Sequence, residues 1–217
     1  ILMPFAWMAA VNMEGKPWES NFERTRVWAR RALHVLGYRL EVKNEAHLEQ
    51  DRGYFFICNH QGTLDPALLA ASCPKQIHFV SKKKNERLPV LGRFARAAGV
   101  IHFDRDTKEG NIFMLRQTMT YLKKKQSILL FPEGTRSRSQ KMNPFMENSM
   151  AVAKFNKADI VPVTINYAFD LDGADKPHKT MHVFYGQVLP YETYKNWTEE
   201  QLRLHAQDLV SQNLMED

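Results

Sequence analysis

Residues 54–66 read YFFICNHQGTLDP, and this stretch decides how the rest of the chain is interpreted. Its first five residues are a continuous apolar run, which is typical of a strand buried on both faces of a sheet. A polar loop containing Gly62 follows at once, and Pro66 suits the first turn of a helix. The stretch therefore predicts a buried strand, a short loop that carries His60, and then a helix.

Outward from this stretch, strands and helices alternate. Further strand-like apolar runs lie at residues 77–80, 99–103, 127–131, 160–165 and 181–189. Helical patterns accompany them at residues 66–72, 88–98, 111–125, 145–157 and 198–214. Such alternation predicts an α/β fold, in which a mostly parallel central sheet is flanked by helices.

An amphipathic pattern precedes the α/β region. One stripe at helical spacing contains Trp18, Phe22, Thr25, Ala29, Ala32, Leu33 and Leu36. Arginines 24, 26, 30 and 31 lie beside or behind it, and Gly37 offers a helix stop. We predict an N-terminal amphipathic helical appendage over residues 1–37 that associates with a membrane surface, and a second domain over residues 38–217. A helix that simply packs on the domain is the alternative.

The composition limits the possible classes of ligand and the cellular compartment but does not identify the ligand. The 217 residues carry a formal net charge of +6, which attracts nucleic acid, anionic lipid and acidic carriers such as coenzyme A alike. Lys82, Lys83 and Lys84 fit either coenzyme A phosphates or a solvated face. Two cysteines provide no disulfide framework and suit a reducing compartment. The apolar stretch at residues 1–11 is shorter than the roughly 20 residues that cross a bilayer, and whether a spanning segment precedes residue 1 is open.

The loop at residues 59–65 carries the first candidate for chemistry. His60 should emerge at the carboxyl end of its strand, where open α/β sheets bind ligands. Asp65 would lie near the start of the next helix, whose positive end favours an ionised carboxylate. The loop can fold this carboxylate back onto the imidazole, so that Asp65 orients His60 and stabilises its protonated form. Cys58 ends a buried strand, so we expect it to be a small buried hydrophobic residue rather than a nucleophile. His60 is then expected to act as a general base on a substrate hydroxyl.

A second candidate follows another apolar strand. Residues 131–138 read FPEGTRSR. Gly134 allows a tight turn, Thr135 offers a hydroxyl, and Arg136 presents a planar fork that matches a phosphate. This segment therefore predicts an anion site.

Taken together and in this order, these stretches resemble the 1-acylglycerol-3-phosphate acyltransferases, within the wider glycerolipid acyltransferase superfamily. Four family blocks are present, namely NHQGTLD at residues 59–65, GVIHFDR at 99–105, FPEGTRS at 131–137 and IVPV at 160–163. The resemblance covers residues 38–190 and identifies residues 38–217 as a glycerolipid acyltransferase domain.

The resemblance implies an O-acyltransferase of phospholipid biosynthesis. It would transfer a fatty acyl group from acyl-CoA or acyl carrier protein to the free hydroxyl of 1-acylglycerol-3-phosphate, forming phosphatidic acid. His60 would be the catalytic base, supported by Asp65. The implied substrate-binding residues are Arg136 for the acceptor phosphate, Arg105 as additional charge, and Glu133, Gly134 and Thr135 as pocket-shaping groups. The thioester is a co-substrate, so neither a metal nor a resident cofactor is expected. We expect the enzyme at the cytoplasmic face of a membrane, with no nucleic-acid partner.

One departure leaves the acceptor open. Members of the family commonly carry Phe-Lys-x-Gly after the third block, whereas residues 145–148 here read FMEN. Another lysolipid or glycerol-3-phosphate therefore remains an alternative acceptor. An acyl thioesterase could use the same His–Asp pair with water, but it has no need of the arginine-bearing turn. A nucleic-acid-binding module would account for the charge but gives no reason for a buried strand that delivers a His–Asp loop.

Overall fold

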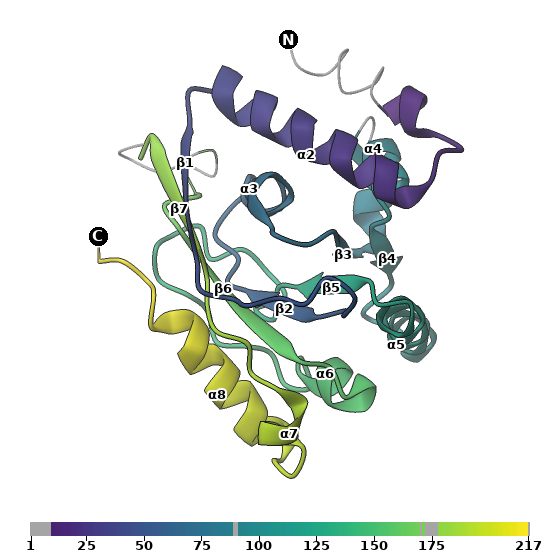
Figure 1. Cartoon of the computed structure of the whole chain (residues 1–217), viewed down its shortest axis with the longest axis vertical. Coiled ribbons are helices and arrows are strands. Elements are labelled where there is room, and N and C mark those ends of the chain that lie inside the picture. Colours follow the sequence, from purple (N-terminus) through teal and green to yellow (C-terminus); the bar gives the residue numbers. More distant parts are fainter. Residues whose placement is uncertain (1–9, 89–90, 170, 172–177, 217) are drawn as a thin grey trace.

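The computed structural model describes residues 10–88, 91–169, 171 and 178–216 (Figure 1). Within these residues seven strands form one sheet in the order β1-β7-β6-β2-β5-β3-β4. The strands are β1 (Arg39–Asn44), β2 (Phe55–Cys58), β3 (Ile77–Lys82), β4 (Ile101–Phe103), β5 (Ser127–Leu130), β6 (Ile160–Asn166) and β7 (Thr180–Tyr185). Neighbouring strands are parallel except for β6 and β7, which are antiparallel. The predicted fold class is confirmed.

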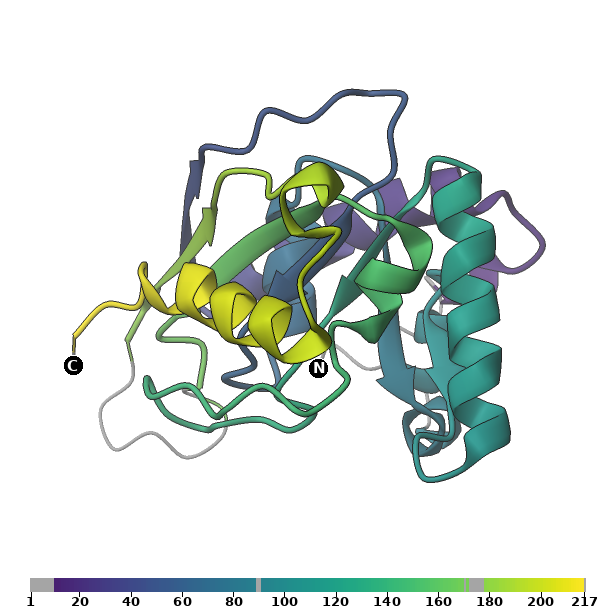
Figure 2. The same ribbon diagram turned by 90° about the horizontal axis from the view of Figure 1, so that it is seen from below.

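Helices cover both faces of this sheet, as Figures 1 and 2 show. Their bounds are α2 (Trp18–Val35), α3 (Asp65–Ser72), the 3-10 helix η1 (Lys83–Arg87), α4 (Leu91–Ala97), α5 (Lys108–Lys123), α6 (Ala151–Asn156), α7 (Tyr191–Tyr194) and α8 (Glu199–Ser211). On one face lie α2 and α3, and on the other lie α6 and α8 (Figure 1). Among the strands and helices described, β1, η1 and α7 were not expected from the sequence.

Strand β2 is the centre of the molecule. It pairs with β5 on one side and β6 on the other, and its side chains are fully buried. Phe56 and Cys58 contribute to the core beneath α2 and α3, whereas Phe55 and Ile57 contribute to the core beneath α6 and α8. The continuous apolar run thus reflects burial on both faces, and its carboxyl end delivers residue 60 to the middle of the sheet edge.

The apolar stripe of α2 is not available to a membrane, which corrects the expectation from the sequence. Phe22, Thr25, Ala29 and Leu33 are buried, and they pack above α3. Burying this stripe inside the protein removes the same apolar area from water as a bilayer would, so the packed alternative holds for it. The apolar stretch at residues 1–11 lies largely outside the described residues. Among the helices that are described, none combines the length and hydropathy that a bilayer span requires.

Two of the four arginines on α2 bind α3. Arg26 donates from Nη2 to the carbonyl of Cys73 at 2.9 Å, and Arg30 donates from Nε to the carbonyl of Ala71 at 2.9 Å. The last carbonyls of a helix have no partner within the helix and carry partial negative charge, so guanidinium groups there are stabilising. These arginines therefore anchor α2 to the carboxyl end of α3.

An aromatic stack joins α2 to the sheet. The ring of His78, which is buried on β3, lies between Trp18 at 3.8 Å and Tyr121 at 3.9 Å, measured between ring centroids. The Trp18 indole N–H also donates to the carbonyl of Ala98 at 3.0 Å. The amino-terminal helix is thus tied to the domain by ring packing and hydrogen bonds at the end opposite to Leu33.

Candidate active site

His60 and Asp65 lie in hydrogen-bond contact at the carboxyl end of β2. The distance from His60 Nδ1 to Asp65 Oδ2 is 2.6 Å, and the same carboxylate oxygen accepts from the Gly62 N–H at 3.0 Å. The Asp65 side chain is fully buried, whereas that of His60 is 20% exposed. A buried carboxylate that orients a partly exposed imidazole can hold the Nδ1–H tautomer, which leaves Nε2 to accept a proton.

The local sequence explains this contact. Helix α3 begins at Asp65 itself, with Leu64 as N-cap and a proline in the first turn, so Asp65 lies one residue further into the helix than an N-cap. Burial raises the pKa of the Asp65 carboxyl, while the hydrogen bond from His60 opposes that rise by favouring the charged form. The positive end of α3 acts in the same direction as His60.

Phe131 and Glu133 hold the other side of His60. The rings of His60 and Phe131 stack with centroids 4.2 Å apart. Glu133 accepts from the backbone N–H of His60 at 2.6 Å and from that of Asn143 at 2.9 Å. Because both carboxylate oxygens receive backbone N–H groups and the side chain is buried, Glu133 ties two loops together here rather than lining an open pocket. Burial raises the pKa of this carboxyl, and the bond from His60 N–H opposes it.

Three cationic side chains lie near one another, and one of them, Arg136, contacts the His60 loop. The Arg136 Nη1 group donates to Thr63 Oγ1 on the loop that carries His60. Arg105, which follows β4, donates to the carbonyl of Gly134 at 3.1 Å. Lys82 ends β3, and its pKa is lowered first by burial and then by the charge of Arg105, with Arg136 also contributing. The sequence patterns had not selected Lys82 from its lysine run, and only the order of the strands brings it here.

The turn at Gly134 needs a glycine for two reasons. Its φ is +65°, and a Cβ added there would collide with the Met146 sulfur. Met146 lies in the FMEN segment that departs from the family pattern, and Asn148 in that segment has φ +60°. Asparagine tolerates this left-handed conformation better than most residues other than glycine. The missing basic residue is replaced by Met146, which covers Gly134 instead. Thr135 is exposed beside this turn.

Cys58 has the surroundings of a core residue. Cys58 is buried, and its pKa is raised well above the ordinary value, chiefly by burial, so its thiol stays neutral.

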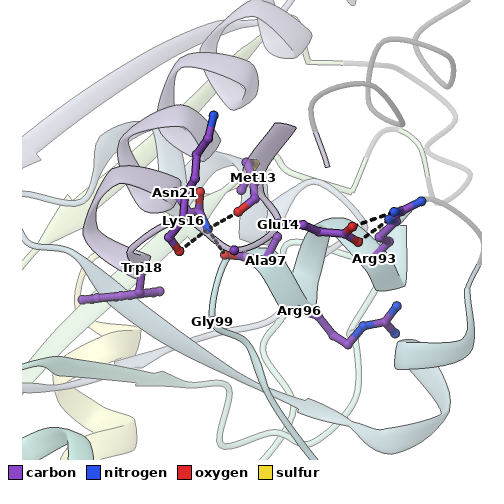
Figure 3. A pocket seen from close by; sticks show the side chains of 10 residues that line it. Met13, Glu14, Lys16, Trp18, Asn21, Arg93, Arg96, Ala97 and Gly99 are labelled. Carbon is purple, nitrogen blue, oxygen red and sulfur yellow. Dashed lines mark hydrogen bonds and ion pairs between the residues drawn. The ribbon is translucent and has the colours of Figure 1, made fainter. Parts of the chain in front are cut away.

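A separate cavity of about 350 Å³ lies between the start of α2 and α4 (Figure 3). Glu14 and Arg93 form an ion pair across it at 2.5 Å, and Asn21 donates to the carbonyls of Met13 and Ala97 (Figure 3). None of the residues that line this cavity belongs to the His60 site. Within the described part of the chain, no group of His, Cys, Asp and Glu is arranged to hold a metal.

The amino-acid sequence also matches a known protein family. Residues 39–166 match the model of the family described as Acyltransferase. The chain belongs to this family. The resemblance to acyltransferases inferred from the four sequence blocks is thereby confirmed.

Relatives and a solved structure agree with this assignment. The chain is 33% identical over 135 residues to the 1-acyl-sn-glycerol-3-phosphate acyltransferase of Saccharomyces cerevisiae. The aligned region covers 61% of this chain and 44% of the yeast protein. It is 23% identical over 190 residues to the enzyme of that name from Escherichia coli, covering 86% of this chain and 77% of the relative. The chain thus spans less than half the length of the yeast relative.

The fold is also that of a solved acyltransferase. The crystal structure of the 1-acyl-sn-glycerophosphate (LPA) acyltransferase PlsC from Thermotoga maritima superposes with a TM-score of 0.80. The superposition covers 98% of this chain and 88% of that chain, at 18% sequence identity. At this identity the likeness establishes the fold.

Proposed function

We propose that the chain transfers a fatty acyl group from an acyl thioester to the free hydroxyl of 1-acylglycerol-3-phosphate, forming phosphatidic acid. The observation that carries the proposal is the 2.6 Å contact of His60 with a buried Asp65, beside the arginine-bearing turn after β5. The names of the yeast and Escherichia coli relatives support the choice of acceptor. The donor is coenzyme A or acyl carrier protein as a co-substrate, and the reaction uses no resident cofactor.

The proposed reaction is direct transfer. His60 Nε2 takes the proton of the acceptor hydroxyl while the hydroxyl oxygen attacks the thioester carbonyl. The tetrahedral intermediate then collapses, the C–S bond breaks, and the imidazolium returns the proton to the leaving thiolate. Asp65 stabilises the imidazolium between these steps. No acyl-enzyme is required, which agrees with the neutral, buried thiol of Cys58.

The proposed acceptor site consists of Arg136, Arg105 and Lys82. Arg136 lies on the same loop system as His60, since it donates to Thr63. An arginine fork can bind two phosphate oxygens at once, and the two further cations add attraction for a dianion. The distance between base and phosphate site then selects an acceptor that carries its free hydroxyl near a phosphate.

Membrane association is proposed for a second face of α2. Arg24, Val27, Arg31 and Val35 recur at helical spacing away from α3, and the two valines are 47% and 63% exposed. Each cation near anionic lipid contributes about 1 kcal/mol. This face would lie on the cytoplasmic leaflet, and the division at residue 37 stays a prediction.

Flotation with anionic vesicles tests this membrane face. Replacing Arg24 and Arg31 by Glu should reduce flotation with phosphatidylglycerol vesicles in low salt. The matched control is the same replacement of Lys123 and Lys124, which are exposed at the end of α5. Equal flotation of both variants and the unmodified chain would remove the membrane proposal.

The activity test follows thiol release and lipid product together. The chain is incubated with acyl-CoA or acyl carrier protein thioester and, in separate reactions, with 1-acylglycerol-3-phosphate, lysophosphatidylcholine or glycerol-3-phosphate. We expect phosphatidic acid and an equal amount of thiol. Thiol release without a new ester would identify a thioesterase, and product only with another acceptor would correct the substrate.

A further inference from the structure

Three carboxamide side chains are buried behind the His60 loop. Gln61, Gln140 and Asn166 are 1%, 5% and 2% exposed, respectively. Gln61 follows the proposed base, Gln140 lies on the loop after Arg136, and Asn166 ends β6. A buried amide destabilises a fold unless its polar atoms are hydrogen-bonded, so the partners of these groups need an account.

Each carboxamide donates to the next. Gln61 Nε2 donates to Gln140 Oε1 at 2.9 Å, and Gln140 Nε2 donates to Asn166 Oδ1 at 2.5 Å. Backbone N–H groups just after β6 bind the side-chain oxygens of the two glutamines. Ala168 N–H donates to Gln61 Oε1 at 2.9 Å, and Tyr167 N–H donates to Gln140 Oε1 at 3.1 Å. The amide dipoles therefore run in one direction and reinforce one another.

The series ends on the carboxyl-terminal tail after α8. Asn166 Nδ2 donates to the carbonyl of Asn213 at 3.1 Å, and Met215 N–H donates to Asn166 Oδ1 at 2.9 Å. Gln140 Nε2 also donates to the carbonyl of Met215 at 3.1 Å. A segment about 150 positions from His60 in the sequence thus terminates a hydrogen-bond series that starts at the residue next to it.

The same loops are joined through their backbones. Ser137 N–H donates to the carbonyl of His60 at 2.7 Å, and Arg138 N–H donates to the carbonyl of Gln61 at 3.0 Å. Arg136 is adjacent to these donors. The side chains of Glu133, Arg136 and Gln140 add three bonds to these two backbone bonds. Of these five bonds, the Gln61–Gln140 bond links the two loops to the rest of the carboxamide series, so whatever holds Gln61 and Gln140 helps to set the relative position of the loops.

We propose that Gln61, Gln140 and Asn166 form a positioning series that sets the separation between His60 and Arg136, with tail residues 213–215 as its anchor. The inference rests on the proposed function, in which one acceptor molecule must reach both the base and the phosphate site. Misplacement of a reacting group by about 1 Å can cost a hundredfold in rate. A hydrocarbon core at these positions would pack as well but would not specify the register of the two loops.

A double-mutant cycle tests whether the carboxamides act as a unit. Gln140→Leu and Asn166→Leu should each lower kcat for acyl transfer by about ten- to a hundredfold, and the double variant should be no slower than the worse single one. The matched control is Thr164→Val. Thr164 is equally buried on β6, and its hydroxyl donates to the carbonyl of Val210 on α8 at 2.6 Å rather than to either loop. Its variant should lose stability and keep kcat.

A gentler variant covers the case in which these substitutions prevent folding. Met215 is 44% exposed, and Met215→Pro deletes the backbone N–H that binds Asn166 Oδ1 while keeping the carbonyl that Gln140 binds. We expect a fall in kcat of several-fold with a nearly unchanged melting temperature. Met215→Ala keeps the N–H and should match the unmodified chain.

The ratio of acyl transfer to thioester hydrolysis separates positioning from plain structural support. Hydrolysis uses His60 and water and does not need the registration with Arg136, so the ratio should fall in the Gln140, Asn166 and Met215→Pro variants. If transfer and hydrolysis fall together, or if kcat stays within twofold of the Thr164→Val control, the positioning role is wrong while the proposed function stands. An unmodified chain that transfers no acyl group would instead refute the proposed function.

Discussion

Replacing Asp65 by Asn isolates the charge that supports the proposed base. The substitution keeps the shape of the side chain at a position with no exposure, directly against the imidazole. Because Asp65 Oδ2 accepts from both His60 and Gly62, an asparagine whose amide oxygen lies at that position can keep both bonds. The N–H₂ group then takes the place of Oδ1, which has no hydrogen-bond partner among the described residues, so the substitution removes chiefly the negative charge that stabilises the imidazolium.

The size of the effect follows from the geometry. With Nδ1 and Oδ2 2.6 Å apart, the centres of the two charges in the transition state are about 4 Å apart, which at an effective dielectric of about 20 corresponds to about 4 kcal/mol. That energy equals about three powers of ten in rate. The effect on stability should be small, because the neutral amide removes a charge whose burial itself is unfavourable.

The assay compares kcat for acyl transfer with the melting temperature by circular dichroism. We expect Asp65→Asn to lower kcat by about 10²–10⁴-fold while the melting temperature changes by a few degrees at most. Asp159→Asn is the matched control, because Asp159 is also a buried carboxylate, bonded to Tyr191 N–H at 2.8 Å and paired with Arg52 at 2.8 Å. A well-folded Asp65→Asn protein with kcat within a few-fold of normal would refute the assignment of His60 and Asp65.

Three further outcomes are expected. Arg136→Ala should raise the KM for the phosphorylated acceptor by about ten- to a hundredfold, and Arg136→Lys should recover part of it, whereas a KM change confined to the acyl donor would reverse the assignment of the pocket. Gly134→Ala should cost more stability in urea unfolding than Gly37→Ala, because both have positive φ but only Gly134 is covered by Met146; equal losses would exclude that contact as a cause. Cys58→Ala should retain most activity in the thiol-release assay, and an inactive but folded variant would point to an acyl-enzyme.

The sequence predicts most of the central sheet because burial on both faces leaves a strong pattern. Strands β2 and β6 are fully buried, and their apolar runs coincide with the observed strands within a residue at either end. Strand β1 was missed because it is an edge strand with mostly exposed, charged residues. Leu40 and Val42 alternate with charged residues, but this short stretch contains no continuous apolar run. Its partner β7 holds it by backbone pairing, which side-chain patterns do not record.

The candidate site was predictable where its residues are neighbours in sequence. His60 and Asp65 share one loop, and Arg136 lies in a distinctive turn. Lys82 and Gln140 were not selected, because lysine runs and single glutamines are ordinary surface features of a sequence. The strand order, which places β3 next to β5 and β5 next to β2, brings Lys82 toward Arg105 and Arg136, and Gln140 is identified only by its bond to Gln61. The orientation of α2 also depended on tertiary packing, since a buried stripe and a membrane-facing stripe have the same period.

The anchoring of α2 to α3 has a practical consequence for any shortened version of the protein. Helix α3 starts at Asp65 and ends beneath Arg26 and Arg30, so the two ends of one short helix serve the site and the appendage. A chain cut to begin at residue 38 would uncover the apolar surface now beneath Phe22 and Leu33 and would leave the last carbonyls of α3 to water. We therefore expect such a fragment to aggregate or to lose activity, and a soluble catalytic fragment should be designed to keep α2 in place.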